Sequence, residues 1–162
     1  MRSRTRPRRL VSLIVILAVT ALAGALASVT TLPQIPGWYA GLAKPAWTPP
    51  NAVFAPAWTA LYLMMSIAAW LAWHARDRRR ARAAIGLYLV QLVLNAAWSV
   101  LFFGMHLVTA ALVDIALLWL LILATTAAFN RVSRTAPLLM VPYILWVAYA
   151  ASLNAGIWWL ER

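Results

Sequence analysis

The chain has 162 residues, of which 65% are hydrophobic and only 10% are charged, and it contains no cysteine. So small a polar fraction excludes a water-soluble globular protein, and the missing thiols exclude disulfide frameworks and cysteine-based metal or catalytic sites. The net charge of +11 is typical of nucleic-acid-binding proteins, but its distribution along the chain argues against nucleic acid as a partner and for membrane lipids.

Five apolar runs are each long enough to cross the hydrocarbon of a bilayer. They cover residues 10–32, 52–74, 83–105, 107–129 and 137–159. Prolines mark two boundaries, since Pro33 follows the first run and Pro50 precedes the second. The third and fourth runs are separated only by a short turn around Gly104 and His106, which makes them antiparallel neighbours. We therefore expect a single domain, an all-α integral membrane bundle of five transmembrane helices with a structured loop between the first two.

Basic residues gather in three segments that five crossings place on one side of the membrane. Together these segments hold 12 of the 14 basic residues, against Lys44 and Arg162 on the other side. The positive-inside rule then predicts a cytoplasmic N-terminus and a C-terminus outside. The arginines concerned are Arg2, Arg4, Arg6, Arg8, Arg9, Arg76, Arg78, Arg79, Arg80, Arg82, Arg131 and Arg134.

A second interpretation of the N-terminus is open. The arginine-rich start, the apolar stretch and Ala25-Leu26-Ala27 before Ser28 imitate a cleavable signal peptide. Cleavage there would leave four helices and reverse the charge argument. The apolar stretch continues to Leu32, which is long for a signal peptide, so we favour a retained first helix.

The segment after the first helix, Trp38 to Pro50, has the sequence WYAGLAKPAWTPP. A flexible linker would be rich in glycine and serine, whereas this segment combines aromatic residues with prolines. We expect a rigid, amphipathic stretch that lies at the membrane interface over the helix ends and acts as a lid.

Aromatic residues and amides form stripes at helical spacing on three of the predicted helices. The stripes consist of Phe54, Trp58 and Tyr62; Gln91, Asn95, Trp98 and Phe102; and Tyr143, Trp146, Ala150 and Asn154. Because an amide that faces lipid is costly, we expect the stripes to point into the bundle. Two interpretations stay open: the amides only bond neighbouring helices, or they orient a large, flat, apolar ligand in an aromatic cavity.

Asp114 is the only acidic residue deep within a predicted span, and an intramembrane carboxylate is by default a functional candidate. It lies about two turns from the start of its helix, so snorkelling to the interface or pairing with His106 explains it equally well. His74 and His106 lie far apart in sequence, and no metal site is expected.

Several of these motifs, in this order, resemble those of the translocator protein family, also called tryptophan-rich sensory proteins or peripheral benzodiazepine receptors. The resemblance runs from about Trp38 to Asn154, while the first helix resembles the family only in being apolar. It rests on WYAGLAKPAWTPP, on AWTALY at 57–62, on QLVLNAAW and LFFG within 91–104, on ALVD at 111–114, and on PYILW and SLN within 142–154. The short loops favour a bacterial member, in the cell membrane.

The resemblance implies a five-helix bundle, usually dimeric, whose cavity under the first loop binds tetrapyrroles such as protoporphyrin IX. No cofactor is expected to be required. By position, Trp58 and Trp146 match the cavity tryptophans that are implicated in light-dependent porphyrin degradation in bacterial relatives. Whether the chain is an enzyme therefore stays open. The expected ligand-binding residues, with Tyr62 added from its stripe, are Trp38, Tyr39, Trp47, Trp58, Tyr62, Asn95, Trp98, Phe102, Trp146, Ala150 and Asn154.

Two departures from the mammalian pattern bear on specificity. Ala110 stands where mammalian members have a tryptophan, which predicts weak affinity for synthetic drugs, and the sterol motif after Asn154 is missing. A porphyrin-binding translocator or sensor is the leading hypothesis; a passive transporter of apolar metabolites or sterols and a regulatory membrane partner are the alternatives. Small residues at spacing four, Ala21 with Ala25 or Gly24 with Ser28, are candidates for the dimer contact.

Overall fold

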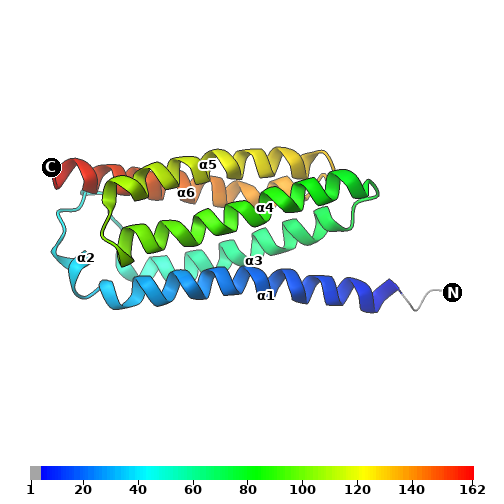
Figure 1. Ribbon diagram of the computed structural model, residues 1–162, viewed down its shortest axis with the longest axis horizontal. Helices are drawn as coiled ribbons and strands as arrows, with labels where there is room; N and C mark the ends of the chain where they lie inside the picture. The colour runs from blue at the N-terminus through cyan, green and yellow to red at the C-terminus, as the bar shows by residue number, and fades with distance from the viewer. Residues whose placement is uncertain (1–4) are drawn as a thin grey trace.

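The computed structural model describes residues 5–162, with the side chains from Arg8 onward, and is an elongated bundle of helices (Figure 1). Five of its helices are long and apolar enough to cross a membrane, which confirms the predicted all-α membrane bundle. The side chains of Arg2, Arg4 and Arg6 lie outside the described part. The helices are α1 (Thr5–Thr31), α2 (Trp38–Gly41), α3 (Phe54–Trp73), α4 (Arg78–Ser99), α5 (Val108–Asn130) and α6 (Ala136–Leu160).

The helix α4 begins at Arg78, five residues before the predicted start at residue 83. Asp77 is its N-cap: the carboxylate accepts a hydrogen bond from the Arg80 amide at 3.0 Å and lies 3.2 Å from Arg80 Nε. Most of the second arginine cluster is therefore helical rather than in a loop. At its other end, α4 continues as a π-helical turn, Val100–Gly104, before His106 adopts a positive φ of 57° and the chain reverses into α5.

The helices are arranged so that α5 and α1 lie on opposite sides of the bundle (Figure 1). The helix α5 packs against α4 and α6, while α1 packs against α3 and α4. The start of α1 and the end of α6 lie at opposite ends of the molecule (Figure 1). We call these the arginine end, which carries the connections α3–α4 and α5–α6, and the loop end, which carries the segment 32–53.

The arginine end is a packed core of small and apolar side chains. Alanines from three helices are fully buried there, which lets the backbones approach closely. Larger side chains such as Met65 and Phe129 fill the remaining space, and both are also fully buried. The buried alanines are Ala68, Ala69, Ala72, Ala84 and Ala136.

Two contacts fasten α1 to α3 at this end. The Trp70 indole donates to the Arg9 carbonyl at 3.0 Å, and Ser12 Oγ lies 2.8 Å from His74 Nε2. Because the Ser12 hydroxyl donates its proton to the Arg9 carbonyl, the imidazole nitrogen is the donor to Ser12. Desolvation, followed by the nearby charges of Arg9 and Arg78, lowers the pKa of His74 below its ordinary value.

Candidate ligand-binding site

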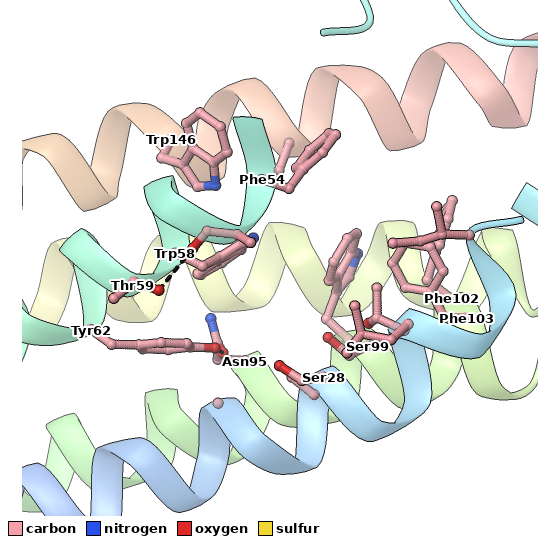
Figure 2. Close-up of a pocket in the computed structure, with 18 of the residues that line it drawn as sticks. Ser28, Phe54, Trp58, Thr59, Tyr62, Asn95, Ser99, Phe102, Phe103 and Trp146 are labelled. Atoms are coloured by element: carbon pink, nitrogen blue, oxygen red, sulfur yellow. Dashed lines mark hydrogen bonds between the residues drawn. The ribbon is translucent and has the colours of Figure 1, made fainter. Parts of the chain in front are cut away.

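A cavity of about 490 Å³ lies in the loop half of the bundle, between α1, α3, α4 and α6 (Figure 2). This volume falls within the range of small-molecule sites, roughly 300–1,000 Å³. In the part of the chain that the structure describes, α5 contributes no residue to the lining. The lining is mostly aromatic and aliphatic, and none of the described residues in it carries a charged side chain.

Aromatic rings from three helices form the walls. Trp58 lies against Tyr62, with ring centroids 5.5 Å apart, and Trp98 stacks on Phe102 at 5.4 Å and 19°. Phe54 meets Trp146 edge to face at 6.0 Å. Such offset and edge-to-face contacts are favourable aromatic geometries, so the rings hold one another in place around the cavity.

The polar stripe of α4 forms a chain of hydrogen bonds at the deep end of the cavity. Tyr62 donates to Asn95 Oδ1 at 2.7 Å, and Asn95 Nδ2 donates to the Tyr143 hydroxyl at 3.0 Å. Tyr143 in turn donates to Gln91 Oε1 at 2.8 Å. These hydrogen bonds connect α3, α4 and α6 and fix Tyr62 on the wall. Figure 2 shows the Tyr62 ring reaching toward Asn95.

A second set of hydrogen bonds fixes Trp98. Its indole donates to Asn154 Oδ1 at 3.1 Å, and Asn154 Nδ2 donates to the Val108 carbonyl at 3.1 Å. Asn95 and Asn154 thus bond neighbouring helices and also line the cavity, whereas Gln91 is fully buried behind it. For the two asparagines, bonding between helices and contact with a ligand are therefore compatible. Gln91 can only bond neighbouring helices.

Nine of the eleven predicted ligand-binding residues line this one cavity. They are Tyr39, Trp58, Tyr62, Asn95, Trp98, Phe102, Trp146, Ala150 and Asn154. Trp38 and Trp47 are not in the lining. The Trp38 ring instead stacks on His106, with centroids 4.1 Å apart, and the Trp47 side chain is 57% exposed.

The loop is fastened over the end of the cavity by contacts with α6. The Tyr149 hydroxyl donates to the Trp47 carbonyl at 2.7 Å, and the Ala43 amide donates to Glu161 Oε1 at 2.7 Å. Between these points Pro45 presses on Gly156: a Cβ on that glycine would lie 2.5 Å from Pro45 Cγ. Two contacts on α6 and one on its C-cap, Glu161, therefore hold the loop in place.

Inside the loop, Lys44 stabilises the short helix α2. Its ammonium group donates to the carbonyls of Tyr39 and Leu42 at 2.7 and 2.9 Å, and it lies 4.9 Å from the centre of the Tyr39 ring. Burial, and secondarily Tyr149, raises the pKa of the Tyr39 hydroxyl, so this phenol stays protonated at neutral pH. The loop therefore presents an uncharged aromatic ring, that of Tyr39, to the cavity.

The helix α1 forms a whole wall of the cavity that the aromatic and amide stripes do not predict. Gly24 is buried there because the Tyr62 ring lies against it: a Cβ at this position would be 2.7 Å from Tyr62 Cε2. Its small size thus serves a contact within the chain, and Ala21 and Ser28 also line the cavity. Small residues recur on one face of α1 at helical spacing, a signal that could have identified this wall: Thr20, Ala21, Gly24, Ala27, Ser28 and Thr31.

Asp114 lies outside the cavity lining, on α5. Its side chain is buried, and Oδ2 finds no hydrogen-bond partner among residues 8–162. The pairing with His106 considered above is not made, because His106 Nε2 lies 3.2 Å from Gln34 Oε1 and its ring stacks on Trp38.

The chain is similar in sequence to proteins of a known family. Residues 14–160 match the family model described as TspO/MBR family. The tryptophan-rich protein TspO of Chlorobaculum tepidum is 44% identical over 138 residues, 84% of this chain and 87% of that protein. The protein CrtK of Rhodobacter capsulatus is 38% identical, covering 89% and 91% of the two chains, and the human translocator protein is 42% identical, covering 75% and 73%.

Proposed function

The chain belongs to the TspO/MBR family, and from that premise and the geometry of its cavity we propose that it binds a tetrapyrrole such as protoporphyrin IX. A tetrapyrrole is a wide, flat and mainly apolar disc. A cavity walled by Trp58, Trp98 and Trp146 offers such a ligand flat surfaces for stacking. This aromatic lining is the observation that carries the proposal.

A fully buried polar group of the cavity lacks a hydrogen-bond partner among the described residues. The indole Nε1 of Trp146 is buried, finds no acceptor within the described residues, and points toward Trp58 and the cavity interior (Figure 2). A buried donor without an acceptor is costly, so a ligand that brings a carbonyl, carboxylate or pyrrole nitrogen to this point gains affinity. The lining residues carry no charged side chain that could pair with the carboxylates of a porphyrin. A carboxylate that does not bond to Trp146 would therefore extend toward the opening of the cavity.

Titration of protoporphyrin IX into the purified protein in lipid nanodiscs, followed by tryptophan fluorescence, tests the proposal. We expect saturable quenching by one ligand per chain. A parallel titration of free N-acetyltryptophanamide corrects for light absorbed by the porphyrin and for collisional quenching. The variant Trp146→Phe keeps a ring and loses the N–H, which should weaken binding by about 2- to 12-fold, the value of one hydrogen bond. Linear, non-saturable quenching of the folded wild type would rule the proposal out.

Light-dependent loss of bound porphyrin is the second part of the proposal, motivated by the two indoles, Trp58 on α3 and Trp146 on α6, in the cavity wall. Illumination of the complex should bleach the Soret band faster in the wild type than in Trp58→Phe or Trp146→Phe, once each sample is adjusted to equal occupancy. Equal bleaching rates in all three proteins would show that these indoles do not take part.

The arginine distribution supports an orientation. We place the arginine end in the cytoplasm and the loop end, with the cavity, toward the outer side of a bacterial cell membrane. Reaction of a single cysteine introduced at Ala46, in the exposed part of the loop, with an impermeant maleimide on intact cells tests this placement. Labelling only after lysis would reverse the orientation.

A further inference from the structure

The cavity is not enclosed, and its open side lies between two particular helices. The exposed residues of its lining all belong to α1, to α3 or to the turns joined to them, whereas none of the lining residues from α4 and α6 is exposed. We call this opening the lateral mouth, formed by Ala21 and Ser28 on α1 and by Ala55, Thr59 and Leu63 on α3. Figure 2 shows Ser28 and Thr59 on the two helices that flank the cavity.

At the loop end the segment 32–53 covers the cavity, and its exposed lining residues are Leu32 and Asn51, next to α1 and α3. The loop is fixed to α6 through Tyr149, Gly156 and Glu161, and its buried Tyr39 forms part of the lining. Passage from the aqueous side would break several of these contacts together.

The mouth is also bounded toward the arginine end. There the Tyr62 ring lies on Gly24, and its hydroxyl is held by Asn95. Beyond this point the contacts of Trp70 with Arg9, described above, close the space between α1 and α3. The contact between Tyr62 and Gly24 thus narrows the opening, and the contact between Trp70 and Arg9 closes it beyond Leu63.

The mouth faces the hydrocarbon of the membrane. Its residues on α3, from Ala55 to Leu63, extend over about 12 Å at 1.5 Å per residue, within a span that is apolar enough to cross the bilayer. Hydrocarbon is roughly 30 Å thick, so the mouth opens mainly onto lipid chains rather than onto water. Small side chains such as Ala21 and Ala55 on its edges leave room for a flat molecule.

From this geometry we propose that the ligand reaches the cavity from the lipid phase, passing edge-on between α1 and α3, and that the loop is a fixed cover rather than the gate. The inference rests on the proposed binding function and adds its route. It implies a ligand that partitions into the bilayer. Exchange is controlled by the gap between α1 and α3.

The absence of cysteine from the chain allows a direct test with introduced pairs. The variant Ser28→Cys with Thr59→Cys places one thiol on each edge of the mouth. The control variant, Ala46→Cys with Ser152→Cys, locks the loop to the exposed face of α6 between its contacts at Tyr149 and Gly156. Each pair is joined after folding by a reducible bis-thiosulfonate reagent, and crosslinking is quantified by mass spectrometry.

Stopped-flow quenching by protoporphyrin IX in nanodiscs then gives association and dissociation rates. We expect the crosslink across the mouth to slow both rates at least tenfold and a reductant to restore them, while the loop crosslink changes them less than twofold. Unchanged rates with a closed mouth, or slow rates with only the loop locked, would overturn the route. Equilibrium binding by the wild type reports separately on the proposed function, because absence of saturable binding there would refute binding itself.

Discussion

The two halves of the bundle use the same helices in opposite ways. Toward the arginine end, buried alanines such as Ala69 and Ala72 bring the backbones together and leave no space for a ligand. Toward the loop end, the same helices carry large rings that are held apart by hydrogen bonds through Asn95 and Asn154, and a cavity of about 490 Å³ remains. A hollow site in a membrane bundle thus depends on a packed base and on polar contacts that fix the rings around the space.

Enlarging a buried alanine should give the largest difference in stability change between the two halves. Ala72→Leu should destabilise the protein by about 1–3 kcal/mol, because the packed base has no space for three more carbons. Ala150→Leu should leave stability nearly unchanged, since its added atoms extend into the cavity. Thermal unfolding in detergent, followed by circular dichroism, measures both; equal losses would mean that the loop half is packed as tightly as the base.

A second pair of variants tests the cover of the hollow half. Gly156→Ala brings a Cβ within 2.5 Å of Pro45 and should destabilise by about 1–2 kcal/mol while the loop amides exchange hydrogen faster. Gly86→Ala is the matched control, because nothing lies within 4 Å of its Cβ, and it should stabilise α4 by about 0.5–1 kcal/mol. If Gly156→Ala behaves like its control, the loop is not held by this contact.

Asp114 allows a test of what it costs to bury a polar group without a hydrogen-bond partner in the loop half. Asp114→Asn should raise the unfolding temperature, by an amount equivalent to about 1 kcal/mol, because a neutral amide costs less to bury than a carboxylate whose Oδ2 has no partner among the described side chains. Asp77→Asn, at the exposed cap of α4, should instead lower stability slightly by weakening the ion pair with Arg80. A destabilising Asp114→Asn would reveal a partner of that carboxylate.

The smallest effect is expected at the arginine end and depends on pH. Since the pKa of His74 is lower in the folded protein than in the unfolded chain, its contribution to stability is present above the unfolded value and is lost as pH falls below it. The midpoint of thermal unfolding should therefore decline between about pH 7.5 and pH 5.5. In His74→Gln this decline should be shallower; an identical slope would remove His74 as its source.

The spacing of residues predicts the inner walls of the site well. Trp58, Asn95, Trp98 and Trp146 recur at helical intervals, and polar or aromatic stripes in a membrane helix have a strong reason to face inward. The wall from α1 carries no such signal beyond small size, which is also common at helix contacts of other kinds.

Other features depend on tertiary contacts that no local pattern encodes. The position of Trp38 is set by stacking on His106, and that of the loop by Pro45 on Gly156, residues more than 60 positions away in both cases. The early start of α4 was predictable in principle, because Asp77 before a run of arginines is a helix cap.

The measurement that tests the central claim most directly is the protoporphyrin IX titration of Ala150→Leu beside the wild type. If the hollow half is the binding site, the wild type saturates, and the variant binds at least tenfold more weakly although its unfolding midpoint is unchanged. Equal affinities in the two folded proteins would contradict the account, because the ligand would then bind outside the cavity.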